Sequence, residues 1–230
     1  LGGEIVLDNC TVNQTGLHSA PYLSMAIAVS NGGKAIVNSG TYEAKPTSAA
    51  EGNNQGTSHG SWCAGVMNSG GTLIINGGTF TNGNYGEDSL ATAARGLLFS
   101  DTKAIIEING GVFNGLKDIL DIQNNLGDAA NNPKVYINGG KYSANPMDSN
   151  HANLIVLKES HEIAENTDGS FGLVRVLRGT GTETDPYLIQ DIEDLKLFAS
   201  EVNKGNTYAN KYIKLVNDIN LEGINWTSIG

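Results

Sequence analysis

Several residue types are scarce in this sequence, and each scarcity argues against a class of protein. The 2 cysteines, Cys10 and Cys63, are too few for a disulfide framework or a cysteine-based zinc site, so we expect two free thiols. Only 14 Lys and Arg residues oppose 24 Asp and Glu residues, and the formal net charge is −10. Because phosphate groups attract clustered basic side chains, this balance argues against a nucleic-acid partner and an anionic membrane surface. No apolar run approaches the length of a membrane span, so we expect no direct membrane insertion.

Glycine, with 30 residues, is abundant, and much of it belongs to a short pattern that recurs along the chain. The clearest copy is residues 70–80, Gly-Gly-Thr-Leu-Ile-Ile-Asn-Gly-Gly-Thr-Phe. Further copies occupy residues 2–12, 32–42, 106–113 and 135–142. Aligned on the position of Asn76, the copies are anchored at residues 8, 38, 76, 109 and 138, which are 30, 38, 33 and 29 residues apart. A period in this range is typical of a solenoid or a propeller.

Each copy predicts two strands, one on either side of the anchor. The residues three and one before the anchor are apolar in every copy, and this alternation indicates a strand with one buried face. A second buried strand follows the turn, because the fourth residue after the anchor is apolar or aromatic throughout: Val12, Tyr42, Phe80, Phe113 and Tyr142. Asn followed by Gly turns a chain sharply, since both residues tolerate left-handed backbone geometry. We expect the stacked Asn side chains to hydrogen-bond from copy to copy as a ladder.

A further apolar run precedes most copies, for example residues 25–29 and 63–67, so each repeat holds several strands. This density of strands favours an all-β fold, a right-handed parallel β-helix (solenoid), over residues 1–177. A propeller, whose blades need four strands each, is the alternative, and a hairpin interpretation of Asn-Gly competes locally. Because the sequence opens inside a copy, we expect it to be a fragment of a longer protein.

The repeat pattern stops at Arg178, so residues 178–230 form a second predicted domain of linker, capping helix and first strands of a following module. Residues 191–204 predict a helix, because apolar residues fall on one face and acids occupy the first turn. An amphipathic helix of this length needs a surface, and the open end of the β-helix would supply one, so we expect a cap. The sequence leaves open whether residues 178–230 pack on the first domain, and it does not define the oligomeric state.

The second domain carries a resemblance to a known family. Four blocks of this domain carry the resemblance, in this order: Gly-Thr-Gly-Thr-Glu-Thr-Asp-Pro-Tyr-Leu-Ile at residues 179–189, Glu-Asp-Leu at 193–195, a predicted strand at 212–221 and Asn-Trp-Thr-Ser-Ile-Gly at 225–230. These blocks resemble modules of large bacterial cell-surface proteins, the adhesin-like GLUG-motif proteins with parallel β-helix repeats. The resemblance covers residues 179–230 and implies an extracellular protein on the bacterial cell surface. It implies no catalytic residue.

Two long, polar, Gly-rich excursions, residues 43–61 and 81–94, follow the second and third copies. Equivalent positions in successive repeats project from one side, so we expect these loops to be neighbours and to form any ligand-binding surface. The candidate ligand-binding residues are the rings beside them: Trp62, Tyr85, His59 and Tyr22. Such rings stack on sugars, although packing under a loop explains them equally well. The expected ligand is a glycan or a host surface protein.

A carbohydrate-active enzyme, either a polysaccharide lyase or a glycosidase, is the alternative function. A lyase needs carboxylates, with calcium, beside a basic residue, and the nearest candidates are Lys117, Asp118 and Asp121, with Arg95 one repeat earlier. Asp118 and Asp121 are three residues apart and fall on opposite faces of a strand. The Asn-Thr-Asp at residues 166–168 resembles part of the polygalacturonase signature, but no adjacent Asp pair accompanies it, and glycoside hydrolysis needs paired carboxylates.

The regular repeat, the acidic charge and the resemblance together predict a non-enzymatic module of a bacterial surface adhesin. In this prediction the chain is a stalk and display scaffold outside the cell, and it needs neither a metal nor a cofactor.

Overall fold

The computed structural model describes residues 2–16, 25–46, 62–67, 70–82, 97–115, 119–122, 128–149 and 151–230. The chain divides into two compact units. Unit 1 is Leu1–Lys158 together with Ile163–Leu173, and unit 2 is Glu159–Glu162 together with Val174–Gly230.

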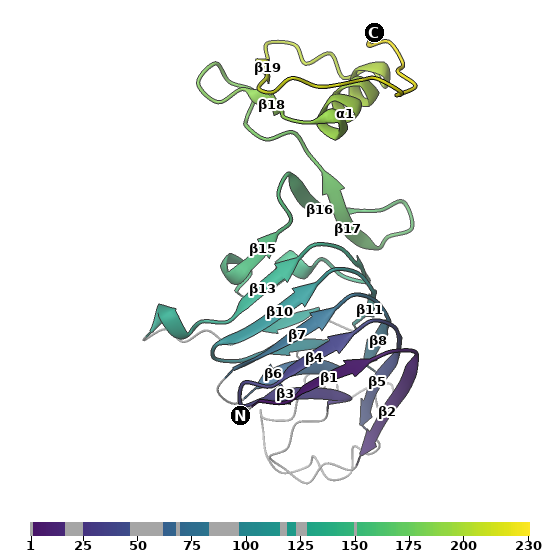
Figure 1. The fold of residues 1–230 in the computed structure, drawn as a ribbon, viewed down its shortest axis with the longest axis vertical. Helices are drawn as coiled ribbons and strands as arrows, with labels where there is room; N and C mark the ends of the chain where they lie inside the picture. Colours follow the sequence, from purple (N-terminus) through teal and green to yellow (C-terminus); the bar gives the residue numbers. More distant parts are fainter. Residues whose placement is uncertain are drawn as a thin grey trace. The chain divides into compact units, whose positions relative to one another are not determined.

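The strands that precede the anchors form the first sheet of unit 1. Its order is β1 (Glu4–Leu7), β4 (Lys34–Val37), β7 (Gly71–Ile75), β10 (Ala104–Ile108), β13 (Lys134–Ile137) and β15 (Ile155–Leu157), and all pairs are parallel. The register aligns the repeat copies, since Ile5 pairs with Ala35, Ala35 with Leu73 and Leu73 with Ile106. Each predicted strand of the repeat therefore hydrogen-bonds to the same strand of the next copy (Figure 1).

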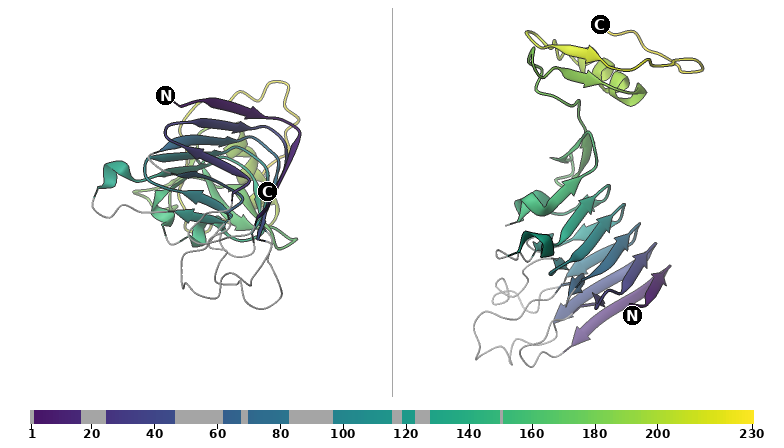
Figure 2. Two further views of the ribbon diagram at one scale, coloured as in Figure 1. Left: turned by 90° about the horizontal axis from the view of Figure 1, so that it is seen from below. Right: turned by 60° about the vertical axis from the view of Figure 1, so that its left-hand side comes forward.

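The strands that follow the anchors form the second sheet, and the apolar runs between copies form the third. The second sheet contains β2 (Cys10–Gly16), β5 (Gly40–Pro46), β8 (Thr79–Asn82), β11 (Val112–Asn114) and β14 (Lys141–Tyr142) in parallel, followed by β17 (Phe171–Arg175) and β16 (His161–Glu165). The third is parallel throughout, in the order β12 (Leu120–Ile122), β9 (Leu98–Ser100), β6 (Ala64–Met67), β3 (Ile27–Ser30). Figure 2 shows strands of successive copies side by side. Short 3-10 helices occupy Ala129–Asn131, Pro146–Asp148 and Ala152–Leu154.

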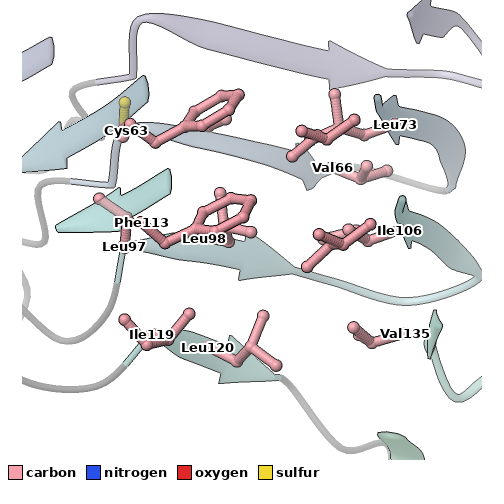
Figure 3. Packing of buried hydrophobic residues seen from close by; sticks show 14 of the residues in the cluster. Cys63, Val66, Leu73, Leu97, Leu98, Ile106, Phe113, Ile119, Leu120 and Val135 are labelled. Carbon is pink, nitrogen blue, oxygen red and sulfur yellow. The ribbon is translucent and has the colours of Figure 1, made fainter. Parts of the chain in front are cut away.

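The inward side chains of the three sheets pack into one core (Figure 3). Its largest fully buried members include Tyr42, Phe80, Phe113, Tyr142, Leu73 and Ile106. The four aromatic rings form a continuous stack, with centroids 5.1, 5.1 and 5.0 Å apart and planes within 19° of parallel. The buried column predicted four residues after each anchor is confirmed for these four copies.

The anchor side chains form the expected ladder. The Nδ2 groups of Asn76, Asn109 and Asn138 each donate to the anchor Oδ1 of the preceding copy at 3.0 Å, and Asn38 is the first acceptor. In the first copy the anchor is Asp8, which accepts a hydrogen bond from the Ser39 hydroxyl at 2.6 Å. The prediction of a hydrogen-bonded Asn ladder is confirmed.

Unit 2 contains a β–α–β element. The strands β18 (Tyr187–Ile189) and β19 (Ile213–Leu215) pair in parallel, and helix α1 (Ile192–Asn203) connects them and contacts β18. Asp191 caps the helix by accepting from the Asp194 N–H at 2.9 Å. Asp194, only 1% exposed, also accepts from the Arg175 Nε at 2.8 Å. Among the described residues, no helix has the length and apolar character needed to cross a membrane.

The fold class predicted from the sequence, an all-β right-handed parallel β-helix with a capping helix, is wrong. The described residues form several separate sheets, and the second sheet is mixed because β14 pairs antiparallel with β17. Helix α1 lies in unit 2 between two parallel strands, an arrangement of the α/β type. The repeat pattern specifies how copies pair with one another, but it ends at β14. Beyond that strand, β17 pairs antiparallel with β14, and helix α1 contacts β18 within unit 2.

Candidate functional site

The segments that connect the second sheet to the third begin and end in two aligned rows. They follow β2, β5, β8 and β11 in the sequence and precede β3, β6, β9 and β12. Because both sets of strands are paired in parallel register, the departure points are neighbours, and so are the return points. Parts of the two predicted loops belong to strands, since residues 43–46 lie in β5 and 81–82 in β8. Residues 47–61 and 83–94 lie outside the described residues.

A buried cluster of Trp62, Phe99 and Asp121 lies at the return row. Phe99 pairs in register with Asp121, while Leu98 and Leu120, their neighbours along the strands, point into the core. The cluster therefore occupies the face of the third sheet that is opposite the core. Its members are nevertheless only 4%, 7% and 8% exposed, in the order named.

The three side chains of the cluster contact one another directly. The Trp62 Nε1–H donates to Asp121 Oδ2 at 3.0 Å, and the rings of Trp62 and Phe99 lie 4.7 Å apart at 49°. Gly65 makes room for this arrangement, because a Cβ at that position would lie 2.8 Å from both the Cβ and the carbonyl oxygen of Phe99. A carboxylate out of water is costly unless it is hydrogen-bonded, so the indole N–H stabilises Asp121 in its place.

Both cysteines contact Tyr42, one at its backbone and one at its ring. The Cys63 thiol donates to the Tyr42 carbonyl oxygen at 2.9 Å, and the Cys10 Sγ lies 3.2 Å from the Tyr42 hydroxyl. Both thiols are free, as the sequence predicts. Burial raises the pKa of Cys63 to about 12, so the thiol stays protonated and is a poor nucleophile at neutral pH.

The structure brings together two residues that the sequence assigns to different candidate sites. Trp62, a predicted ligand-binding ring, is buried against Phe99, which supports packing rather than sugar stacking for this residue. Asp121, from the lyase-like set, is its hydrogen-bond acceptor. The other predicted residues lie outside the described residues: Tyr22, His59, Tyr85, Arg95, Lys117 and Asp118.

A second polar cluster lies where the turn between β16 and β17 meets β14. Lys141 Nζ donates to Asp168 Oδ2 at 2.6 Å, and Asp168 Oδ1 accepts from the Ser170 N–H at 3.0 Å. The hydrogen bond from Lys141, followed by those from Ser170, holds the pKa of Asp168 well below its usual range. These residues, with Asn114 and Ser143, line a hollow of about 310 Å³. Both Asp168 oxygens have partners that order the turn, a role that the sequence did not reveal.

The remaining buried carboxylate of note is Asp194, which Arg175 and helix α1 hold in unit 2. In the described part of the chain, no group of three or more His, Cys, Asp or Glu side chains is placed to hold a metal ion. No protein-family model, curated protein or solved structure matches this chain.

Proposed function

We propose that this chain is a non-enzymatic display module of a bacterial cell-surface protein. Its parallel sheets present the connections between the second and third sheets in one row, where they bind a glycan or a protein. The observation that carries the proposal is the shared register of the strands on both sides of these connections. Loops carry binding functions when a rigid scaffold positions them, and register fixes their ends about one strand spacing apart, roughly 4.8 Å.

The repeated contacts between copies support a scaffold role. The aromatic stack and the Asn ladder each run through four successive copies. Stacked aromatic pairs contribute about 0.5–1.5 kcal/mol each beyond their buried area. Contacts of this kind link neighbouring repeats, so each copy stabilises the next.

The two buried carboxylates, together with Asp168 at the hollow, support a binding role over a catalytic one. Asp121 accepts from Trp62, Asp168 from Lys141 and Asp194 from Arg175. Each of these three groups has a structural partner. Glycoside hydrolysis needs two carboxyl groups facing one bond, and these three lie in separate clusters of the fold.

The surface location rests on the resemblance of residues 179–230 to GLUG-motif proteins and on the acidic charge of the chain. A formal net charge of −10 favours solubility outside the cell and disfavours anionic polymers as ligands. Neutral glycans and proteins with basic patches are the ligands that this charge favours.

The test is a binding screen on immobilised neutral glycans and extracellular proteins with the parent chain and two variants. Gly65→Val places its side chain against Phe99 and displaces the cluster under the return row, so we expect it to weaken binding. Lys196→Ala removes an exposed ion pair with Glu193 on helix α1 and is the matched control, which we expect to bind like the parent. Equal binding by all three chains would contradict the placement of the ligand at this row.

A further inference from the structure

The dipeptide Asn-Gly occurs six times in the sequence, at Asn31, Asn76, Asn82, Asn109, Asn114 and Asn138. Asparagine before glycine is chemically labile, because the glycine lacks a Cβ that would hinder its own backbone nitrogen. That nitrogen can attack the side-chain carbonyl carbon of the asparagine and displace ammonia. The reaction requires the carboxamide to rotate toward the backbone and the following N–H to be free. The structure places these equivalent dipeptides in different hydrogen-bonding environments.

Three of the six asparagines belong to the ladder. At each of them both the carboxamide and the N–H of the following glycine are hydrogen-bonded. The Asn76, Asn109 and Asn138 carboxamides each donate to the preceding copy at 3.0 Å. The N–H groups that follow them, at Gly77, Gly110 and Gly139, donate to backbone carbonyls of the preceding copy at 3.1–3.3 Å. Rotation of one carboxamide therefore breaks a hydrogen bond of the ladder, and attack requires the loss of a second.

Solvent exposure does not separate the ladder from the other dipeptides. Asn76 and Asn109 are exposed, as is Asn114. Among the residues that the structure describes, however, the Asn114 carboxamide has no hydrogen bond and the Gly115 N–H has no acceptor. Asn114 is also the last residue of β11, and at Gly115 it is the carbonyl oxygen that is hydrogen-bonded, by the Ser143 hydroxyl at 3.0 Å.

Asn31 provides an intermediate case. It is exposed, but the Gly32 N–H that follows it donates to the Gly70 carbonyl oxygen at 2.9 Å. One of the two requirements is therefore blocked there. The remaining dipeptide, Asn82-Gly83, extends beyond the described residues.

We propose that Asn114 is a site of spontaneous deamidation, and that the Asn ladder protects Asn76, Asn109 and Asn138 from the same reaction. The Gly115 nitrogen forms a bond to the Asn114 Cγ and loses its proton, the bond from Cγ to the side-chain nitrogen breaks, and ammonia leaves. Water then opens the resulting succinimide at either carbonyl and yields aspartate or isoaspartate. One water is consumed and one ammonia is released, with no change of oxidation state.

The modification would alter the hollow that Asn114 shares with Lys141 and Asp168. A carboxylate at position 114 adds one negative charge to a site that already holds an ion pair. The isoaspartate product also inserts one carbon into the backbone at the end of β11, next to the departure row. The reaction therefore changes the surface beside the connections without touching the core.

The first experiment follows the native chain during incubation at mildly alkaline pH, with peptide mass mapping and enzymatic methylation of isoaspartate. We expect Asn114 to convert at least about fivefold faster than each ladder asparagine, the factor that one net hydrogen bond corresponds to. Asn31 should lie between them. In a parallel sample unfolded in urea, the rates at Asn114 and the ladder positions should converge, because all have Gly as the next residue. Equal rates in the native chain would overturn the proposal.

The second experiment removes one hydrogen bond of the ladder by substitution. Asn109→Ala removes the acceptor of the Asn138 carboxamide, so we expect Asn138 to convert about fivefold faster while Asn114 is unchanged. Asn109→Asp is the matched control, because its carboxylate still accepts from Asn138, and conversion at Asn138 should stay slow. An unchanged Asn138 rate in Asn109→Ala would refute protection by the ladder. The comparison of native with urea-unfolded parent chain does not depend on how either variant folds.

Discussion

The hydrogen bond between Trp62 and Asp121 makes a quantitative prediction for the candidate site. The indole N–H and the carboxylate oxygen lie 3.0 Å apart, and both side chains are more than nine-tenths buried. A hydrogen bond to a charged group stabilises a protein by about 1.5–3 kcal/mol, and a buried group left without a partner costs about 1–3 kcal/mol. We therefore expect Asp121→Ala and Trp62→Phe each to lower the free energy of unfolding of unit 1 by about 2–3 kcal/mol.

The double-mutant cycle isolates this contact from the packing that each substitution also removes. The packing and the other contacts of Asp121 that the single variants lose cancel in the cycle, so the double variant should be less destabilised than the sum of the single variants by the energy of this hydrogen bond. We expect a coupling energy of about 1.5–3 kcal/mol. Urea unfolding monitored by circular dichroism suits this measurement, because Trp62→Phe removes the fluorescence probe of unit 1. Additive effects, with a coupling energy below about 0.5 kcal/mol, would refute the reasoning.

Three further predictions concern the core and unit 2. Phe113→Leu removes two stacked ring contacts and should lower the free energy of unfolding by about 1–3 kcal/mol more than a non-aromatic control such as Ile106→Val. Urea unfolding measures both losses, and equal losses would contradict a stabilising stack. Ser100→Ala removes a buried hydroxyl that has no partner and should raise the free energy of unfolding by about 1 kcal/mol; a loss would refute this. Hydrogen bonds from the helix N–H and from Arg175 lower the pKa of Asp191, so its stabilising effect is complete above the unfolded pKa and is lost as the pH falls toward the folded one. Thermal unfolding at acid pH should be less pH-dependent in Asp191→Asn, and an unchanged slope would contradict this.

The sequence predicts the strand pairing in the repeated parts of unit 1 well, because the same residue pattern recurs in each copy. Alternating apolar residues before the anchor specify the strands of the first sheet, and the aromatic position after it specifies the stack from Tyr42 to Tyr142. Asn at the anchor predicts the ladder, since identical side chains in register lie within hydrogen-bonding distance. Because the pattern is repeated, the register between strands of successive copies can be predicted without knowledge of the whole fold.

The parts that occur once were not predictable in the same way. The antiparallel pairing of β17 depends on which edge is free after β14, and the sequence-based fold class failed at this point. Trp62 and Asp121 are 59 residues apart, in segments that share no pattern, so their contact has no signal in the sequence. The pairing of Arg175 with Asp194 likewise joins a strand to a helix that the sequence placed in different domains.

The measurement that tests the account most directly exposes the purified chain to immobilised neutral glycans, surface proteins and uronate-containing polysaccharides, and records binding and product release together. The account predicts saturable binding to at least one glycan or surface protein, weakened in Gly65→Val, with no release of unsaturated or reducing sugars. Release of such products by the parent chain would contradict a non-enzymatic display module.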